Sequence, residues 1–182
     1  MTGGPSASAG GPDVLVRPAV PADADAIGEV HVAGWRAAYR GQLPDVLLDG
    51  LSVEDRRSTW RRRLEPPTRS AVWVGTLGGR VVGFASTGPA ADPDLDPARV
   101  TELFALYLLP ACWGQGVGFA LHGAVLARAR ADAREALTLW VLRTNARGGA
   151  FYERQGWRPD GAEQRKPFRD VLLDEVRYRR PV

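Results

Sequence analysis

One segment limits the folds open to this chain more than any other. An apolar run over residues 100–109 leads into a turn with three glycines at residues 114–118. The run carries a single charged residue, Glu102, and stops at Pro110, which is typical of a strand buried on both faces in the middle of a sheet. Helical spacing of apolar residues follows the turn. A helix that begins directly after glycines presents unpaired N–H groups and the positive end of its dipole, and these can bind a phosphate or pyrophosphate.

Two common nucleotide-binding patterns do not fit this turn. A dinucleotide-binding fingerprint that starts at Gly114 needs glycine at position 119, where the chain has Phe119, and it needs an early βαβ unit. A P-loop needs a Gly-Lys-Ser/Thr sequence, and the turn has no lysine. The residues themselves leave two interpretations open: an anion site for another kind of ligand, or a helix N-terminus without any ligand.

The rest of the chain shows strand and helix patterns in turn. Two β-rich runs around Gly78-Gly79 predict a hairpin, and Ser52 with Asp55 resembles a capping box that opens a helix. The order of the elements predicts an α+β fold, with one mixed sheet and helices packed on it. We predict helices up to about residue 39, over 43–51, over 52–64, from the glycine turn to about 133, and over 146–155. We predict strands that begin at residue 14 and at residue 157, and further strands over 71–77, 80–87, 100–109, 137–142 and 171–178.

Length and composition indicate one ordinary globular domain. Of the 182 residues, 45% are apolar and 25% are charged, which excludes a disordered or fibrous chain. Residues 1–13 are small and rich in Gly, Ser and Pro, so we expect a flexible tail there and a single domain over 14–182. No apolar run approaches the ~20 residues of a membrane span, and nothing at the start resembles a secretory signal. We therefore expect a cytoplasmic protein without membrane contact.

Cysteine, histidine and arginine usage excludes further classes of function. One cysteine, Cys112, excludes an internal disulfide, and two histidines, His31 and His122, are too few for a histidine-based metal centre. We expect the two histidines to be packed or on the surface and Cys112 to be a small packed residue, and we expect no metal. The net charge is only +3. The arginines between 56 and 63 would spread around a helix rather than form one stripe, so no nucleic-acid partner is predicted.

The glycine turn and the strand before it resemble the acetyl-CoA-binding segment of the GNAT superfamily of N-acetyltransferases. That family's pattern is an apolar strand, often a proline, then Arg/Gln-x-x-Gly-x-Gly/Ala and a helix. Gly116 and Gly118 match its two defining glycines, and Trp113 stands where the family usually has Arg or Gln. This departure removes one side chain but no backbone donor.

A second family element follows at the expected distance. Asn145 comes after the next strand, and residues 150–157, Ala-Phe-Tyr-Glu-Arg-Gln-Gly-Trp, resemble the family's Phe-Tyr-x-x-x-Gly-Phe element. The resemblance covers about residues 14–179. It implies a mostly antiparallel central sheet of about seven strands flanked by four or so helices.

The resemblance implies where acetyl-CoA binds. The N–H groups of residues 115–119 would hold the pyrophosphate, and the end of the preceding strand would pair by its backbone with the pantetheine arm. Asn145 would contact the cofactor, or it would only cap a loop. The residues that the resemblance places at the cofactor are Leu106, Tyr107, Leu108, Trp113, Gly114, Gln115, Gly116, Val117, Gly118, Phe119, Asn145 and Tyr152.

Two residues match catalytic positions of the family. Tyr152 matches the tyrosine that protonates the departing CoA thiolate, a step that suits a phenol with a pKa of ~10; otherwise it fills a core beside Phe151. Glu102 occupies the position of the general-base glutamate of the histone-acetyltransferase members, and burial would raise its pKa toward a useful range. The alternatives are a water ordered by other groups, or a strand-end glutamate paired with an arginine.

The acceptor is expected over the first helix. The segment from Trp35 to Pro44, with Trp35, Arg36, Tyr39 and Gly41, resembles a subgroup near the polyamine-type acetyltransferases. Trp35 and Tyr39 share a helix face and would wall an amine pocket or belong to the core, and Arg36 would bind an acceptor's carboxylate or lie in solvent.

The resemblance implies an acyl-CoA-dependent N-acetyltransferase that acts on a primary amine of a small molecule or peptide. The alternative is a related protein that binds acyl-CoA as a regulator with little catalysis. From the resemblance alone, we also expect a homodimer.

Overall fold

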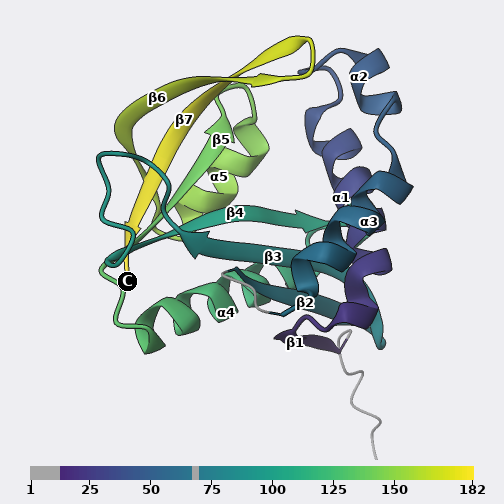
Figure 1. Ribbon diagram of the computed structural model, residues 1–182, viewed down its shortest axis with the longest axis horizontal. Helices are drawn as coiled ribbons and strands as arrows, with labels where there is room; N and C mark the ends of the chain where they lie inside the picture. Colours follow the sequence, from purple (N-terminus) through teal and green to yellow (C-terminus); the bar gives the residue numbers. More distant parts are fainter. Residues whose placement is uncertain (1–12, 67–69) are drawn as a thin grey trace, which may run out of the picture.

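The computed structural model describes residues 13–66 and 70–182, so the predicted tail over 1–13 lies outside the described residues apart from Asp13. The predicted elements are present with small shifts at their ends, and β3 runs two residues further than expected (Figure 1). No helix in the described part is long and apolar enough to cross a membrane. The helices are α1 (Ala24–Tyr39), α2 (Asp45–Asp49), α3 (Val53–Leu64), α4 (Val117–Ala131) and α5 (Ala146–Arg154). The strands are β1 (Val14–Pro18), β2 (Ala71–Leu77), β3 (Arg80–Pro89), β4 (Val100–Leu108), β5 (Ala136–Leu142), β6 (Arg158–Phe168) and β7 (Val171–Pro181).

All seven strands join one sheet in the order β1-β2-β3-β4-β5-β7-β6. Every neighbouring pair is antiparallel except β4 and β5, which run parallel. The predicted mixed, mostly antiparallel α+β sheet is therefore confirmed. β4 is the fourth of the seven strands, which is the central position that its apolar sequence predicted.

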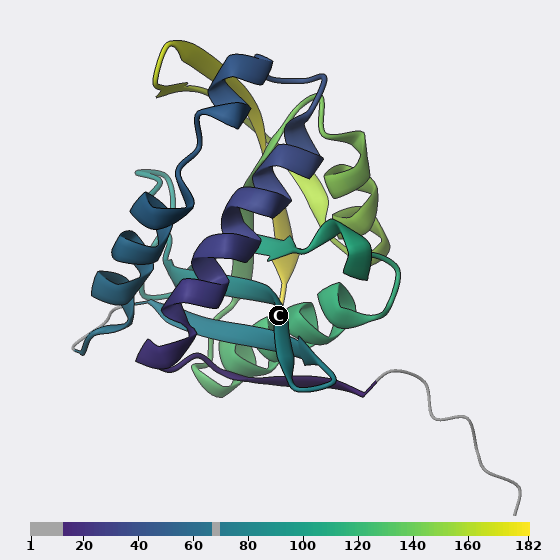
Figure 2. The same cartoon turned by 90° about the vertical axis from the view of Figure 1, so that its right-hand side faces the viewer.

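The helices cover both faces of the first half of the sheet. α1 crosses one face, against β3 and β4, with α3 beside it, and α4 lies under the other face (Figures 1 and 2). The side chains of Ile27, Trp60 and Phe84 form the core between α1, α3 and the sheet. Ser52 accepts a hydrogen bond from the N–H of Asp55, so the predicted N-terminal cap of α3 is confirmed.

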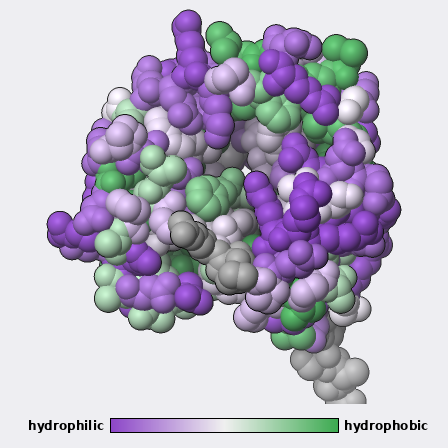
Figure 3. Space-filling view, viewed as in Figure 1, coloured by the Kyte–Doolittle hydropathy of each residue, from purple (hydrophilic) through white to green (hydrophobic). Residues whose placement is uncertain are grey.

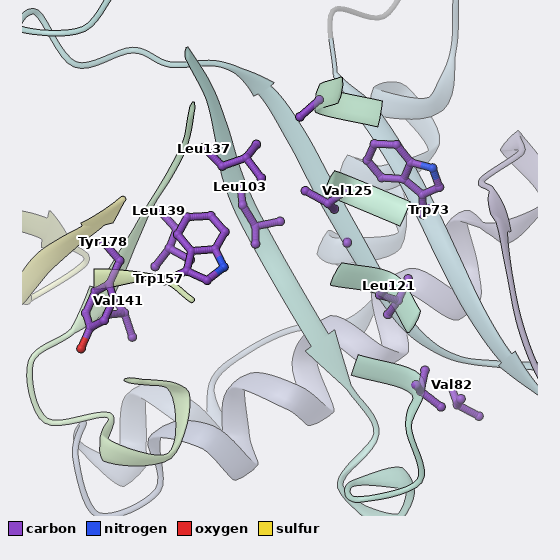
Figure 4. Packing of buried hydrophobic residues seen from close by; sticks show 13 residues of the cluster. Trp73, Val82, Leu103, Leu121, Val125, Leu137, Leu139, Val141, Trp157 and Tyr178 are labelled. Carbon is purple, nitrogen blue, oxygen red and sulfur yellow. The ribbon is translucent and has the colours of Figure 1, made fainter. Parts of the chain in front are cut away.

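A second core cluster joins α4 to the other half of the molecule. Leu121 and Val125 of α4 and Leu103 of β4 belong to the same buried cluster as Trp157 and Tyr178, which come from the α5–β7 region (Figure 4). Trp157 is fully buried and follows Gly156, whose positive φ of 84° ends α5. The two halves of the sheet therefore share one hydrophobic core on this side.

β4 and β5 separate after a short stretch of pairing. They pair only over Val100–Glu102 and Ala136–Thr138, and β4 then continues without β5 beside it. The prediction that β4 is buried on both faces is therefore wrong: Val100 and Leu103 are buried, but Phe104 is 45% exposed. The apolar side chains of this half of β4 line cavities instead of a closed core.

A β-bulge in β4 decides which side chains face α1. Leu103 pairs with Thr87 and Ala105 with Ser86, so Phe104 is an extra residue opposite β3. Because the bulge reverses the alternation of side chains, Glu102 lies on the same face as Ala105 and Tyr107. A regular strand would have turned Glu102 toward α4.

Candidate active site

Two cavities meet along the unpaired half of β4. The first, of about 660 Å³, lies between α1, α3, β4 and the β6–β7 hairpin, and the second, of about 450 Å³, lies between β4, the glycine turn and α5. The surface in Figure 3 is hollowed near its centre, below the β6–β7 hairpin. We call the first the acceptor cavity and the second the crevice. Both are lined by Tyr39, Leu103, Phe104, Ala105, Tyr107 and Trp140.

The glycine turn forms one wall of the crevice. Gly114 and Gly116 have φ values of 79° and 84°, in the left-handed region that favours glycine. Gly116 is the N-cap of α4, and among the described residues no side chain caps this helix end. The first N–H groups of α4 therefore have no helical acceptor. They supply the donors and the dipole end for an anion that enters the crevice.

Trp113, at the position where the family usually has Arg or Gln, carries a guanidinium from another part of the chain on its ring. The guanidinium carbon of Arg147 lies 3.8 Å from the ring centroid of Trp113, in a cation–π contact, and both residues line the crevice. Sequence reasoning missed Arg147. Its place two residues after Asn145, at the N-terminal turn of α5, was the available signal. The contact restores a guanidinium beside the glycine turn.

Asn145 is a helix cap that also lines the crevice. Its side chain accepts a hydrogen bond of 3.0 Å from the N–H of Gly148 and caps α5. The predicted loop-capping role is therefore present, and the same residue borders the crevice. The cap holds the start of α5, and with it Arg147, at the crevice wall.

Tyr152 lies half-buried at the crevice. Its ring packs against Phe151 and Trp157 at centroid distances of 5.3 and 5.7 Å. Its hydroxyl has no hydrogen-bond partner within the described residues, and the residue lines the crevice. Burial, with a contribution from Tyr39, raises the pKa of Tyr152, so the phenol keeps its proton across the neutral range.

Two half-buried carboxyls line the acceptor cavity. Burial raises the pKa of Glu102; the charges of Asp92 and Glu175 raise it further, and a backbone hydrogen bond from Ala91 and the charge of Lys166 lower it. Burial also raises the pKa of Glu175, although Gln164 donates a hydrogen bond of 2.7 Å to it. Sequence reasoning missed Glu175, because only the sheet order brings β7 to this cavity.

Aromatic side chains form the wall between the two cavities and the outer wall of the acceptor cavity. Trp35 packs against Tyr39 at 5.1 Å and against Phe168 at 4.9 Å between ring centroids. The hydroxyls of Tyr39 and Tyr107 are 3.0 Å apart. Burial raises the pKa of both tyrosines, so this pair is neutral. Trp35 and Tyr39 line the cavity, and Tyr39 also belongs to a buried core cluster against which Trp35 packs, so each predicted alternative describes part of their position.

Three predicted site residues have side chains directed elsewhere. The Arg36 guanidinium donates to the carbonyls of Leu48, Asp49 and Leu51, and it closes the end of α2 instead of lining the cavity. The prediction that Arg36 binds the acceptor is therefore wrong.

The other two side chains belong to the glycine turn itself. Gln115 donates to the carbonyl of Ala111, and Val117 is fully buried in the core. Neither side chain lines the crevice, and burial leaves only the backbone of Val117 available to a ligand.

The histidines and the cysteine are packed, as predicted. Trp60 donates an indole N–H to His31 over 3.1 Å, and Trp157 donates to His122 over 2.8 Å. Burial, with nearby arginines, lowers the pKa of His31 to about 3 and of His122 to about 4, so both are neutral near pH 7. Cys112 is half-buried against the α4 core. In the described residues there is no group of three His, Cys, Asp or Glu that could hold a metal.

A buried ion network supports Trp140, which lines both cavities. Arg177 is 5% exposed and pairs with Asp92, Asp94 and Asp160 at 3.2, 2.6 and 2.8 Å. Trp140 donates its indole N–H to Asp92. The network ties the loop after β3 to β6 and β7.

Solved structures share this fold. The PaiA N-acetyltransferase of Thermoplasma acidophilum, solved with coenzyme A, matches with a TM-score of 0.75 at 16% identity, over 93% of this chain and 99% of that one. YncA of Salmonella typhimurium, solved with acetyl-CoA, matches with a TM-score of 0.67 at 21% identity, over 92% of this chain and 93% of that one. At these identities the likeness concerns the fold.

Sequence comparison identifies the family. The chain matches the acetyltransferase (GNAT) family over residues 33–157. It is 28% identical over 174 residues to the probable N-acetyltransferase Rv2775 of Mycobacterium tuberculosis, with 92% of this chain and 93% of that protein covered. It is 31% identical over 165 residues to the uncharacterized N-acetyltransferase YuaI of Bacillus subtilis, with 90% of each covered. Because the family match spans more than half of the chain and agrees with these relatives along nearly all of it, this protein belongs to the GNAT family of N-acetyltransferases.

Proposed function

We propose that this protein transfers the acetyl group of acetyl-CoA directly to a primary amine. One observation carries the proposal. The crevice at the glycine turn and the carboxyl-lined acceptor cavity meet along the unpaired half of β4. A thioester held in the crevice would therefore meet an amine held in the acceptor cavity without a covalent enzyme intermediate.

The crevice residues suit coenzyme A. The amides at the start of α4 would hold the pyrophosphate, and Arg147, stacked on Trp113, would add a positive charge. β4 has no β5 beside it from Leu103 onward, so the backbone of residues 106–108 would pair with the pantetheine arm as an added strand does. Gly118 and Phe119 line the same crevice.

Glu102 and Tyr152 would move the protons of the reaction. Glu102 would accept a proton from the ammonium, directly or through a water, because only the free amine has a lone pair. Once Glu102 has released that proton to solvent, the amine nitrogen would form a bond with the acetyl carbon and give its second proton to Glu102 as the carbon–sulfur bond breaks. Tyr152 would give its proton to the departing sulfur and regain one from solvent. The unpartnered Tyr152 hydroxyl and the raised pKa of Glu102 support these roles.

The first test is a thiol-release assay with acetyl-CoA and a panel of primary amines. Tyr152→Phe is expected to lower kcat by about 10²-fold or more while leaving the Kd for acetyl-CoA within about twofold, since it removes only the proton donor. Tyr178→Phe is the matched control, because the Tyr178 hydroxyl bonds to Glu153 away from both cavities. An unchanged kcat in Tyr152→Phe would remove this residue from the mechanism.

The alternative function is an acyl-CoA-binding regulator, which would bind acetyl-CoA and release no thiol with any amine. The carboxyl-lined acceptor cavity favours the enzyme, because a regulator has no use for a proton acceptor there. The subgroup near the polyamine-type acetyltransferases, the single domain over 14–182 and the homodimer stay predictions. Within the subgroup segment, Arg36 closes α2, and Gly41 takes a positive φ of 77°.

A further inference from the structure

The acceptor cavity holds charges of opposite sign at different places. Glu102 and Glu175 lie at the sheet side, and neither forms an ion pair within residues 13–66 and 70–182. The positive charge of Lys166 acts on both carboxylates and offsets part of their negative charge. This end of the cavity would bind an ammonium group.

The opposite end is formed by Arg56, Arg62 and Arg63 of α3, and Glu65, directly after the helix, also lines the cavity there. Arg56 is half-buried, lines the cavity, and has no carboxylate within ion-pair distance in the described part of the chain. Arg63, seven residues on and therefore on the same helix face, also lines the cavity. Two arginines on the side of α3 that faces α1 behave differently: Arg57 pairs with Glu29 and Glu54, and Arg61 pairs with Asp25 and Glu54.

Among the ion pairs of the described residues, none joins Arg56, Arg62 or Arg63 to a carboxylate. Burial lowers the pKa of Arg56; Arg63 and Arg169 lower it further, and Tyr107 and Asp55 raise it slightly. The charges of Arg56 and Arg63 also help to lower the pKa of His31 inside the cavity. A partly desolvated guanidinium of this kind is stabilised by a bound anion.

Aromatic side chains line the space between the two ends. Trp35, Trp140 and Phe168 line the acceptor cavity, and Trp35 packs against Phe168. The volume of about 660 Å³ is ample for a molecule of dipeptide size. The walls would cover the apolar body of a ligand whose charged groups lie at its two ends.

We propose that the acceptor is a primary amine that carries a carboxylate several bonds away, as a dipeptide or an ω-amino acid does. The amine would face Glu102 and Glu175, and the carboxylate would pair with Arg56. A polyamine would bring a second ammonium to the arginines of α3 and would be repelled. This inference rests on the proposed function, because it assigns the acceptor of the same reaction.

The test compares acceptors that share an amine and differ only at the other end. Dipeptides with an aromatic C-terminal residue are compared with their C-terminal amides, and 6-aminohexanoate with its amide and with 1,6-diaminohexane. Thiol release from acetyl-CoA gives kcat/KM for each. We expect the best carboxylate acceptor to exceed its amide by at least tenfold, and the diamine to be the poorest of its series.

Arg56→Gln is expected to lower kcat/KM for the carboxylate acceptor to the level of its amide and to leave the amide unchanged. Arg56→Lys keeps the charge and should retain part of the preference. Arg61→Gln removes an arginine from the ion-paired side of the same helix and should leave the preference unchanged.

The outcomes separate this inference from the proposed function. If amides or diamines are acetylated as well as the carboxylates, or if Arg56→Gln keeps the preference, the acceptor inference is wrong and the N-acetyltransferase function stands. If acetyl-CoA binds but no amine of any charge releases thiol, the proposed function fails with it.

Discussion

Glu102 is placed on the acceptor side by a single extra residue in β4. The bulge at Phe104 turns Glu102 toward the cavity that also contains Glu175. Burial first, and then the charge of Glu175 among others, raises the pKa of Glu102 above the usual value of a glutamate. A base must be ionised to accept a proton, so activity should rise with pH as Glu102 loses its proton.

We therefore predict that Glu102→Gln lowers kcat by about 10²-fold or more and removes the acidic limb of the pH profile of kcat/KM. The matched variant is Glu175→Gln, which removes a neighbouring negative charge. It should keep the acidic limb but move it to lower pH, because one cause of the raised pKa of Glu102 is gone. An acidic limb that survives in Glu102→Gln would assign the base to another group.

His122 affects stability rather than chemistry. Its ring accepts a hydrogen bond from buried Trp157, and its pKa is lowered to about 4 from an ordinary 6.5, first by burial and then by Arg180. Below pH 6.5 the unfolded chain binds a proton on His122, whereas the folded chain does not until the pH approaches 4. The free energy of unfolding should therefore fall as pH falls, with a contribution from His122 of about 2 kcal/mol between pH 7.5 and pH 5.

His122→Gln keeps a hydrogen-bond acceptor for Trp157 but does not titrate. Urea unfolding at pH 7.5 and pH 5 should show that this variant loses about 2 kcal/mol less than the parent on acidification. His31 contributes a loss of the same sign in both proteins, because its pKa is also lowered. An equal loss in parent and variant would show that His122 is not held neutral.

At the scale of elements, the position of α1 against β4 determines the shape of the acceptor cavity. A Cβ added at Gly34 would lie 3.0 Å from the Cβ of Tyr107, so α1 approaches the strand at van der Waals contact. Tyr107 is held by the pairing of β4 with β3. The glycine therefore permits the close crossing that brings Trp35 and Tyr39 to the cavity.

Two glycine-to-alanine variants separate helix propensity from this close approach. Gly123, in α4, has open space around an added Cβ, and Gly123→Ala should raise the free energy of unfolding by about 0.5–1 kcal/mol. Gly34→Ala should instead lower it by about 1 kcal/mol or more, because overpacking outweighs the same gain in propensity. Thermal or urea unfolding gives both values, and a Gly34→Ala variant as stable as Gly123→Ala would contradict this account.

At the scale of the whole molecule, Arg177 joins segments that are far apart in sequence. It bonds the loop after β3 through Asp92 and Asp94, and β6 through Asp160. The guanidinium also lies 5.7 Å from the ring of Trp140, which lines both cavities. Removing one partner of a buried ionic network leaves the others uncompensated.

Arg177→Met is accordingly predicted to lower the free energy of unfolding by about 3 kcal/mol. Arg179→Met changes an exposed arginine two residues along the same strand and should change it by less than about 0.5 kcal/mol. Denaturant unfolding of the two variants measures the difference. Equal, small effects would show that the network does not hold the loop.

The sequence by itself determined the elements and their broad order. Apolar periodicity, the hairpin at Gly78-Gly79 and the cap at Ser52 are local signals, and the structure contains each of them. The glycine turn was predictable for the same reason. The first N–H groups of a helix lack helical acceptors because of the local chain geometry, whatever distant segments do. These features depend on residues close together in the chain.

Only the tertiary structure decided which side chains share a cavity. The separation of β4 from β5, the bulge at Phe104 and the arrival of Glu175 on β7 all depend on pairing between distant segments. Arg36 shows the same limit, because its acceptors belong to α2 and the turn after it, twelve to fifteen residues further along the chain. Periodicity gives the face of a helix or strand, but which distant partners meet that face is fixed by the packing of the whole sheet.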